Sequence, residues 1–263
     1  MADFNLPTEK AKPTRVNPAI SIFYGPPKIG KTTKLGELDG CLILDAEKGT
    51  EAIDAMRIPI NSISGATVNN ADGTLAFTSV DAIYDKIVAI GMKHFQETGT
   101  KPKPPYKYIA IDTIDKLEDF CEVTATVKYK NTIIGKNFEG KSVIELPNGA
   151  GYYHLRNEVM LQIERLSGIC EHLILISHIR DKNLNKGGVD VSVRDISLTG
   201  RLGQMVCAKA DIVGFVYRDA QDPSKLMVSF ETLEDTTMGS RFPRLAGKRI
   251  LFDWSQIFLP ETK

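Results

Sequence analysis

The sequence has no long hydrophobic run, no paired cysteines and no excess of either charge. No apolar stretch approaches the roughly 20 residues that a membrane-spanning helix needs, and the polar N-terminus does not resemble a signal peptide. The four cysteines, at positions 41, 121, 170 and 207, show neither CxxC nor Cys/His spacing. The absence of these spacings argues against disulfides or a zinc site and favours buried free thiols in a reducing compartment. We therefore expect a cytoplasmic protein without a membrane partner.

The charge balance removes one common argument for nucleic-acid binding. Lys and Arg total 33, as do Asp and Glu, so a DNA site would have to come from local patches. The 263 residues, of which 42% are hydrophobic and 25% charged, suit one large α/β domain. Residues 1–18 are polar and broken by proline. We expect them to form an extended arm, and residues 19–263 to form the domain.

Apolar runs alternate with helical patterns along the chain. Strands are predicted at residues 19–25, 41–47, 106–113 and 172–179, with a weaker one at 60–64. Helices are predicted from residue 31 and at 79–96, 114–130, 152–168 and 200–210. The apolar spacing of Ile83, Ile87 and Ile90 supports the second of these helices. Residues 180–195 suit a loop or a hairpin, and 211–219 with 225–231 suit an antiparallel pair. The fold class predicted is α/β, a mostly parallel sheet flanked by helices with an antiparallel C-terminal extension.

The segment GPPKIGKT, residues 25–32, fits the phosphate-loop pattern G-x-x-x-x-G-K-[ST] with a predicted strand before it and a helix after it. The backbone amides of such a loop bind phosphate oxygens. Lys31 would contact the β- and γ-phosphates, and the Thr32 hydroxyl would be a Mg²⁺ ligand. The residues expected to bind the nucleotide are Gly25, Pro26, Pro27, Lys28, Ile29, Gly30, Lys31, Thr32 and Thr33. The alternative is a glycine-rich turn that binds nothing.

A phosphate loop needs a second carboxylate on the Mg²⁺ side, at the end of a neighbouring strand. Asp112 and Asp45 both end apolar strands, although either aspartate could simply cap the turn that follows it. We favour Asp112 as the metal ligand, because Asp45 is followed by Glu47. Just past its strand, Glu47 could orient a water against the γ-phosphate. A solvated surface glutamate is the alternative.

His178 ends the apolar strand LILISHI and precedes Arg180. A polar residue at such a position can sense the γ-phosphate and pass the signal to the next loop, although a lone histidine at a strand end is more often structural. If His178 acts so, its strand should lie between the phosphate-loop strand and the Asp112 strand. Direct pairing of those two strands would instead indicate a kinase-like class. The catalytic candidates are Glu47, Lys31 and His178.

Taken in order, these segments resemble the core of RecA-type recombinases over residues 19–218. GPPKIGKTT resembles their phosphate loop, and LDAEKG the segment that carries their catalytic glutamate, here Glu47. YIAIDT resembles the strand of the magnesium aspartate, here Asp112. ILISHIRDK resembles the strand whose last polar residue switches the DNA-binding loop, and bacterial RecA proteins have glutamine where this chain has His178. GRLGQMVCAKADIVGFVYRD resembles the helix and strand that follow.

With no sizeable flanking domain, the chain is most similar to phage-encoded RecA-like ATPases, which include single-strand annealing proteins. The resemblance implies ATP, Mg²⁺, single-stranded DNA and self-assembly into a ring or filament, in the host cytoplasm. A single-strand DNA-binding protein is a further candidate partner. The function expected is ATP hydrolysis coupled to annealing or strand exchange. Two alternatives stay open: a small-molecule P-loop kinase and a non-catalytic, nucleotide-gated interaction module.

Two predicted loops combine cations with aromatic residues or glycines, as DNA-binding surfaces often do, although solvated mobile loops would look the same. The first contains Lys128, Tyr129, Lys130, Lys136, Phe138 and Lys141, and the second contains Arg180, Lys182, Lys186, Arg194 and Arg201. In RecA-like filaments, basic residues of one subunit complete the ATP site of the next, and the resemblance implies that one of four C-terminal residues could act in this way: Arg241, Arg244, Lys248 or Arg249. For any single one of them, a solvent-facing basic turn is the alternative. Phe4 of the arm is expected to dock on a neighbouring core, with a disordered tail as the alternative.

Overall fold

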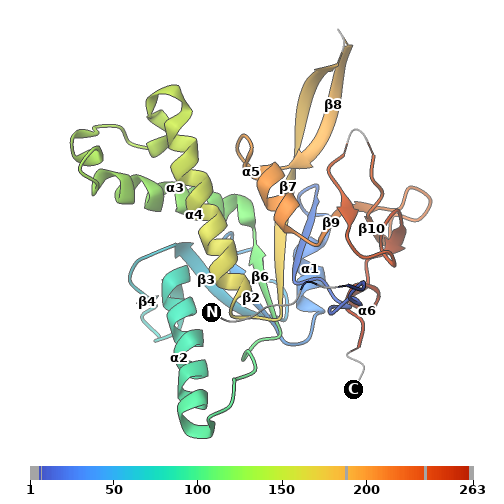
Figure 1. The fold of residues 1–263 in the computed structure, drawn as a ribbon, viewed down its shortest axis with the longest axis horizontal. Coiled ribbons are helices and arrows are strands. Elements are labelled where there is room, and N and C mark those ends of the chain that lie inside the picture. Colours follow the sequence, from blue (N-terminus) through green and yellow to red (C-terminus); the bar gives the residue numbers. More distant parts are fainter. Residues whose placement is uncertain (1–5, 7, 187–188, 234–235, 261–263) are drawn as a thin grey trace.

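The structure is a computed structural model that describes residues 6, 8–186, 189–233 and 236–260, with the side chains of 182–193 left out (Figure 1). Its helices are α1 (Lys31–Gly36), α2 (Val80–Thr98), α3 (Ile114–Lys130), α4 (Ala150–Ser167), α5 (Leu202–Lys209) and α6 (Trp254–Ile257). Its strands are β1 (Ile20–Gly25), β2 (Cys41–Asp45), β3 (Met56–Ser62), β4 (Val68–Asn69), β5 (Leu75–Ser79), β6 (Tyr108–Asp112), β7 (His172–Lys186), β8 (Val189–Ile196), β9 (Ile212–Arg218), β10 (Leu226–Ser229), β11 (Gly239–Ser240) and β12 (Arg249–Leu251).

The strands form one mixed sheet in the order β12-β10-β9-β1-β7-β6-β2-β3-β5-β4, with β11 beside β9 and β8 beside β7. The central strands β9, β1, β7, β6, β2 and β3 pair in parallel. Strands β10 and β12 add the predicted antiparallel extension. The predicted fold class is therefore confirmed. The predicted insertion of β7 between β1 and β6 is confirmed as well.

Strands β1, β2 and β6 are buried along their whole length, because helices cover both faces of the sheet. Alternate residues face opposite ways, so that Ile22 belongs to the core cluster that includes residues of α2, α3, α4 and α5, while Phe23 belongs to the cluster that includes residues of α1 and α6. The parallel register brings Gly25 beside His178 and Asp45 beside Asp112. Gly25, Asp45 and Asp112 end their strands and His178 ends the part of β7 that pairs in parallel, so all four lie along one edge of the sheet.

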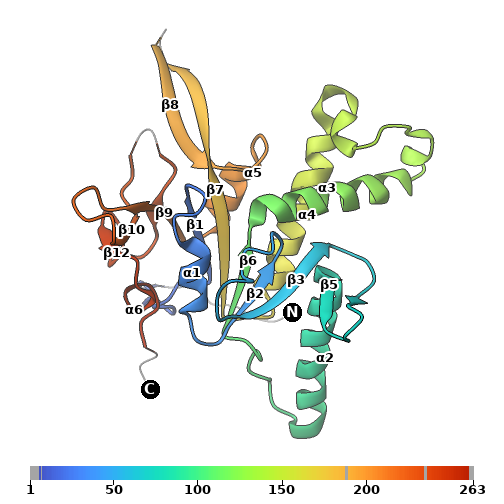
Figure 2. The same ribbon diagram turned by 180° about the vertical axis from the view of Figure 1, so that it is seen from behind.

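Of the loop and the hairpin predicted for residues 180–195, the structure has the hairpin, because β7 continues to Lys186 and pairs with β8. Other local expectations change. The weak third strand begins at Met56 rather than at residue 60, and the short β5 falls in a stretch where no strand was predicted. Ile83 and Ile87 are buried as expected. Ile90 is 49% exposed, because the far part of α2 extends beyond the sheet (Figure 2).

Two structures project from the edge where these strands end, the β7–β8 hairpin and the paired helices α3 and α4 (Figures 1 and 2). Three short 3₁₀ turns join the two helices, at Gly135–Asn137, Val143–Glu145 and Pro147–Gly149. Helix α4 approaches one of these turns closely, since a Cβ on Gly151 would lie 1.8 Å from the Val143 carbonyl oxygen. Within the first predicted DNA loop, a Cβ on Gly135 would lie 1.9 Å from the Tyr129 carbonyl oxygen, so this segment packs closely against the end of α3.

The part of the arm that the structure describes is tied to the C-terminal segment where it meets the domain. The Asn17 amide donates to the Leu259 carbonyl at 2.8 Å and accepts from the Leu259 N–H at 2.7 Å. Residues 8–16 are exposed and form no helix or strand. Phe4, the predicted docking residue, lies outside the described residues. Within the described parts of the chain, no helix has the length and apolar character that crossing a membrane requires.

Candidate nucleotide-binding site

The phosphate loop has the backbone that its sequence predicts. Gly30 has a φ of +113° and Lys28 a φ of +60°, and the first of these favours glycine. Gly25 cannot be larger, because a Cβ there would lie 2.3 Å from the Val216 carbonyl oxygen on β9. The glycines therefore let the loop turn tightly against the neighbouring strand.

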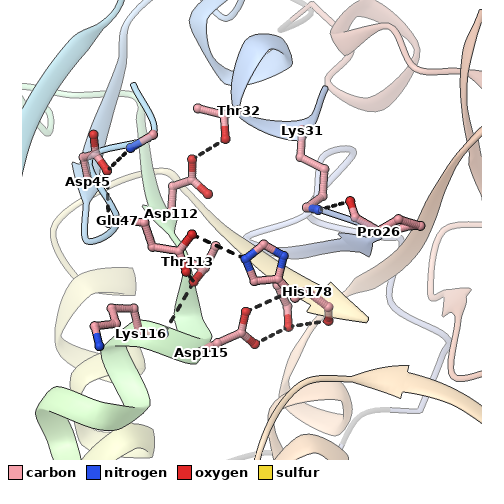
Figure 3. Close-up of polar contacts among 12 residues, drawn as sticks. Pro26, Lys31, Thr32, Asp45, Glu47, Asp112, Thr113, Asp115, Lys116 and His178 are labelled. Atoms are coloured by element: carbon pink, nitrogen blue, oxygen red, sulfur yellow. Dashed lines mark hydrogen bonds and ion pairs between the residues drawn. The ribbon is translucent and has the colours of Figure 1, made fainter. Parts of the chain in front are cut away.

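Lys31 is only 5% exposed, and its ammonium is held by the loop itself. Its Nζ donates to the carbonyls of Gly25 at 2.9 Å and Pro26 at 2.8 Å (Figure 3). Burial lowers the pKa of Lys31, while the carboxylate of Asp112 opposes this effect. The charge is thus concentrated at the mouth of the loop, where an anion would bind.

Thr32 and Asp112 meet although they lie 80 residues apart. The Thr32 hydroxyl donates to Asp112 Oδ2 at 2.6 Å (Figure 3). Burial raises the pKa of Asp112 to about 6, with the Thr32 hydrogen bond opposing and the charges of Asp45 and Glu47 adding to the rise. A cation bound at these oxygens would compensate the buried charge.

The Thr32 hydroxyl and the Asp112 carboxylate suit Mg²⁺ that is shared with a phosphate, rather than a metal ion bound by protein side chains alone. Both groups are oxygen ligands of the kind Mg²⁺ prefers. Among the described residues, no group of three or more His, Cys, Asp or Glu could hold a metal ion. Phosphate and water oxygens would therefore have to complete the coordination, as they do at most nucleotide sites.

Asp45 is engaged in a different task. It is 2% exposed and accepts the backbone N–H groups of Glu47 at 3.2 Å, Gly49 at 3.1 Å and Thr50 at 3.0 Å, as well as the Thr50 hydroxyl. These contacts order the turn that carries Glu47. They use most of the acceptor capacity of Asp45, which favours Asp112 over Asp45 as the metal ligand.

Glu47 reaches from the end of β2 towards the end of β7. Its Oε1 accepts from the Thr113 hydroxyl at 2.8 Å, and its Oε2 lies 3.4 Å from His178 Nε2 (Figure 3). The side chains of Glu47 and His178 are 39% and 32% exposed, so water can reach both. The structure thus brings two of the three catalytic candidates into contact, and Thr113 orients one of them.

Sequence reasoning missed Thr113 and Asp115, which follow Asp112 directly. Asp115 Oδ1 accepts from the Ser177 hydroxyl at 2.7 Å, and Oδ2 accepts from the backbone N–H of His178 at 2.8 Å. Burial raises the pKa of Asp115, and these hydrogen bonds oppose the rise. The available signal was the pattern DTxD, which places a second carboxylate in the first turn of the helix after the strand.

A cavity of about 310 Å³ adjoins the outer side of the phosphate loop. Gly30, Thr33, Arg218, Leu226 and Phe252 are among the residues that line it. Arg218 is another residue that the sequence did not single out, and its guanidinium donates to the Ser224 carbonyl at 2.9 Å. The remaining lining residues are Lys34, Glu37, Ser224, Lys225 and Leu251, so the cavity combines apolar side chains with charged ones.

Three of the basic residues proposed to act on a neighbouring subunit are engaged within their own chain. Arg241 pairs with Asp211 at 3.2 Å, near the amino end of β1 and thus opposite the phosphate loop. Arg244 donates to the carbonyls of Gln256 at 2.6 Å and of Ile257. Arg249 pairs with Glu231. These contacts weaken the case for Arg241 and Arg244 as residues that act in trans.

In the first predicted DNA loop, the cationic and aromatic side chains lie close to one another. Lys128 pairs with the buried Glu158 at 2.6 Å, and the Lys130 ammonium lies 5.7 Å from the Phe138 ring centroid. The rings of Tyr129 and Phe138 pack edge-to-face at 5.5 Å. In the hairpin, the side chains of Lys182 and Lys186 lie outside the described part of the structure.

Comparison with known proteins identifies the family. A family model described as an AAA domain matches residues 17–245. The chain belongs to this AAA domain family. This AAA domain has a phosphate-loop sequence at the end of β1 and a mostly parallel sheet with β7 between β1 and β6, as predicted.

Solved structures similar to this AAA domain include a KaiC-like protein from the hyperthermophilic archaeon Pyrococcus horikoshii OT3. It shares 13% identity and a TM-score of 0.40, and the match covers 90% of this chain and 87% of that one. The RadB recombinase shares 13% identity and a TM-score of 0.37, with 92% and 90% of the two chains covered. None of the curated proteins matches the chain.

Proposed function

We propose that the protein is a Mg²⁺-dependent ATPase that binds single-stranded DNA and promotes annealing or strand exchange, as phage-encoded recombination proteins do. The contact between Glu47 and His178 is the observation that carries this proposal. It joins a carboxylate suited to activating water with the root of the β7–β8 hairpin, so that one pair of side chains connects nucleotide chemistry to a projecting element.

The strand order supports this function over that of a small-molecule kinase. Because β7 lies between β1 and β6, His178 ends beside Gly25 of the phosphate loop. Direct pairing of β1 with β6 would have placed the end of the Asp112 strand, and not His178, beside the phosphate loop. The inserted strand therefore favours a nucleotide sensor over a bare phosphate-transfer site.

Each residue has a role in the proposed hydrolysis. The loop amides and Lys31 bind the β- and γ-phosphates, for which the ammonium leaves the carbonyls of Gly25 and Pro26. Thr32 and Asp112 would hold Mg²⁺, which would neutralise charge on the phosphate oxygens. Glu47 orients the attacking water and takes its proton as the water oxygen bonds to the γ-phosphorus. The bond from the γ-phosphorus to the β-γ bridging oxygen breaks at the same time, and ADP and phosphate leave. His178 contacts the γ-phosphate and Glu47 in turn, which makes the position of β7 depend on the nucleotide.

The two projections provide the DNA surface in this proposal. Both extend from the edge of the sheet that carries the site (Figure 1). Between α3 and α4, the exposed Lys136 can contact a phosphate backbone, and exposed Ile133 and Ile134, at 93% and 86%, can contact bases. Arg201, which is exposed at the start of α5 after the hairpin, adds a second cation. Binding of this kind weakens as salt rises, because it releases counterions from the DNA.

One experiment tests the function and separates the two alternatives. ATP turnover is measured with and without single-stranded DNA, and DNA binding is measured by fluorescence anisotropy in parallel. Turnover that DNA stimulates supports the proposal. Turnover that needs a small-molecule phosphate acceptor would identify a kinase, and ATP binding without any turnover would identify a nucleotide-gated module.

A further inference from the structure

Two carboxylates on α3 accept hydrogen bonds at the base of the β7–β8 hairpin, at the points where the chain enters and leaves it. We call these two points the roots of the hairpin. Asp115, in the first turn of the helix, holds the end of the parallel part of β7 through Ser177 and His178. Glu118, three residues further along, accepts the backbone N–H of Thr199 with both oxygens, at 3.1 and 3.2 Å. Thr199 lies just after β8, where the chain leaves the hairpin.

The two roots are also joined to each other at this point. The Ser197 N–H donates to the His178 carbonyl at 3.1 Å and lies 3.3 Å from the Ser177 hydroxyl oxygen. Ile179 and Ile196 begin the hairpin ladder directly above. Asp115, Glu118 and Ser177 therefore form one hydrogen-bonded block with the base of the hairpin, which we call the α3 clamp.

The same helix begins at the nucleotide site. Asp112 ends β6, Thr113 is the N-cap of α3, and the Thr113 hydroxyl contacts Glu47. A helix is stiff over a few turns, so a shift of its first turn moves Asp115 and Glu118 together. The clamp thus forms a direct mechanical route from the metal-side aspartate to both strands of the hairpin.

Burial makes these contacts specific. Glu118 is 7% exposed, and this burial raises its pKa, with the bonds from Thr199 opposing. A buried carboxylate that loses its donor has no water to replace it, which is costly. The clamp therefore favours one position of the hairpin over others that would leave the carboxylates unpaired.

We propose that Asp115 and Glu118 are positioning residues that couple the nucleotide state of the site to the position of the β7–β8 hairpin. This inference rests on the proposed function and adds a route that does not pass through the His178 side chain. Neither carboxylate needs to touch ATP or DNA. Their removal should affect coupling while leaving nucleotide binding intact.

The test uses Glu118, which lies away from the catalytic groups. Glu118→Ala removes the bond to Thr199. Glu118→Gln keeps one oxygen that can accept from the Thr199 N–H, because both carboxylate oxygens of Glu118 contact this same N–H. Asp119→Ala is the matched control, since Asp119 is a carboxylate on the same helix whose side chain is 61% exposed and pairs with Lys116. Turnover is measured against ATP concentration with and without single-stranded DNA for the full chain and its variants.

We expect Glu118→Ala to lower the stimulation by DNA at least about fivefold, at the lower end of usual coupling between sites. The KM for ATP and the turnover without DNA should stay at the parental values, and Glu118→Gln and Asp119→Ala should behave like the parent. Undiminished stimulation in Glu118→Ala would overturn the inference. So would an equal loss of basal turnover, because Glu118 would then serve stability alone. If Glu118→Ala does not fold, Ser177→Ala is judged by the same criteria.

A second readout separates this inference from the proposed function. Hydrogen exchange of residues 180–196 is compared with and without Mg²⁺ and a non-hydrolysable ATP analogue. The parent hairpin should respond to nucleotide, and the Glu118→Ala hairpin should not. If DNA does not change the turnover of the parent protein, the proposed function is refuted. Hydrogen exchange of the hairpin would still test whether Glu118 couples the hairpin to the nucleotide. Equal responses in parent and variant would overturn the coupling itself.

Discussion

Replacing Asp112 by asparagine should make the metal-free protein more stable and the Mg·ATP complex weaker. Asp112 is 4% exposed, and its charge lies close to those of Asp45 and Glu47. Asparagine has nearly the same shape, and its amide oxygen can still accept from the Thr32 hydroxyl. The substitution therefore removes a buried negative charge and keeps the hydrogen bond.

The pKa of Asp112 determines the size of the effect. A rise from 3.8 to about 6, at about 1.4 kcal/mol for each pH unit, makes the ionised carboxylate cost about 3 kcal/mol at pH 7. Between these two values the folded state binds more protons than the unfolded state, so this contribution to stability rises as the pH falls. At pH 4.5 the cost should be about 1 kcal/mol. We thus expect Asp112→Asn to stabilise the protein by about 1–3 kcal/mol at pH 7 and by less at pH 4.5.

Urea unfolding in EDTA, without nucleotide, measures this difference. Trp254 is the only tryptophan of the chain and is buried against α1, where its indole N–H donates to the Lys34 carbonyl at 2.5 Å. Its fluorescence should therefore report unfolding. Asp119→Asn, which alters an exposed carboxylate, is the control and should leave the free energy of unfolding unchanged. If Asp112→Asn is no more stable than the parent, or if its advantage is the same at both pH values, the reasoning about the buried charge is wrong. Adding Mg²⁺ and ATP should stabilise the parent more than the variant.

Two further substitutions and one deletion test the site and the assembly. Lys31→Ala should lose tight ATP binding in calorimetric titrations and keep its circular dichroism spectrum, because the ammonium contacts the phosphate loop and not the core; parental affinity would refute the phosphate-loop assignment. Glu47→Gln should bind Mg·ATP like the parent but hydrolyse it about 10²–10⁴-fold more slowly, since the amide cannot take a proton from water; undiminished turnover would place the activating group elsewhere. Deleting residues 2–14, which spares the ion pair between Arg15 and Asp211, should lower the oligomer mass seen by light scattering with ATP and single-stranded DNA. An unchanged mass would exclude the arm from assembly.

The sequence alone was sufficient for the features that depend on neighbouring residues. The phosphate-loop pattern constrains its own backbone, because Gly25 and Gly30 occupy positions where a side chain would clash or where φ is positive. Helix α3 runs over residues 114–130 as predicted, since its cap and its apolar spacing lie within the helix. The apolar strands that end in Asp45, Asp112 and His178 were likewise recognisable, because burial on both faces leaves a continuous apolar run.

Only the tertiary structure determined which groups the side chain at each strand end contacts. Asp45 and Asp112 follow similar apolar runs, and the sequence could favour one but could not settle the choice. The fold brings the Thr32 hydroxyl to Asp112 and directs the amides of the following turn to Asp45. Glu118 and Thr199 are 81 residues apart, and their contact exists only because the sheet places β7 beside β6. Hydrogen bonds between distant residues depend on strand order and register, which arise from the packing of the whole sheet and leave no local pattern in the chain.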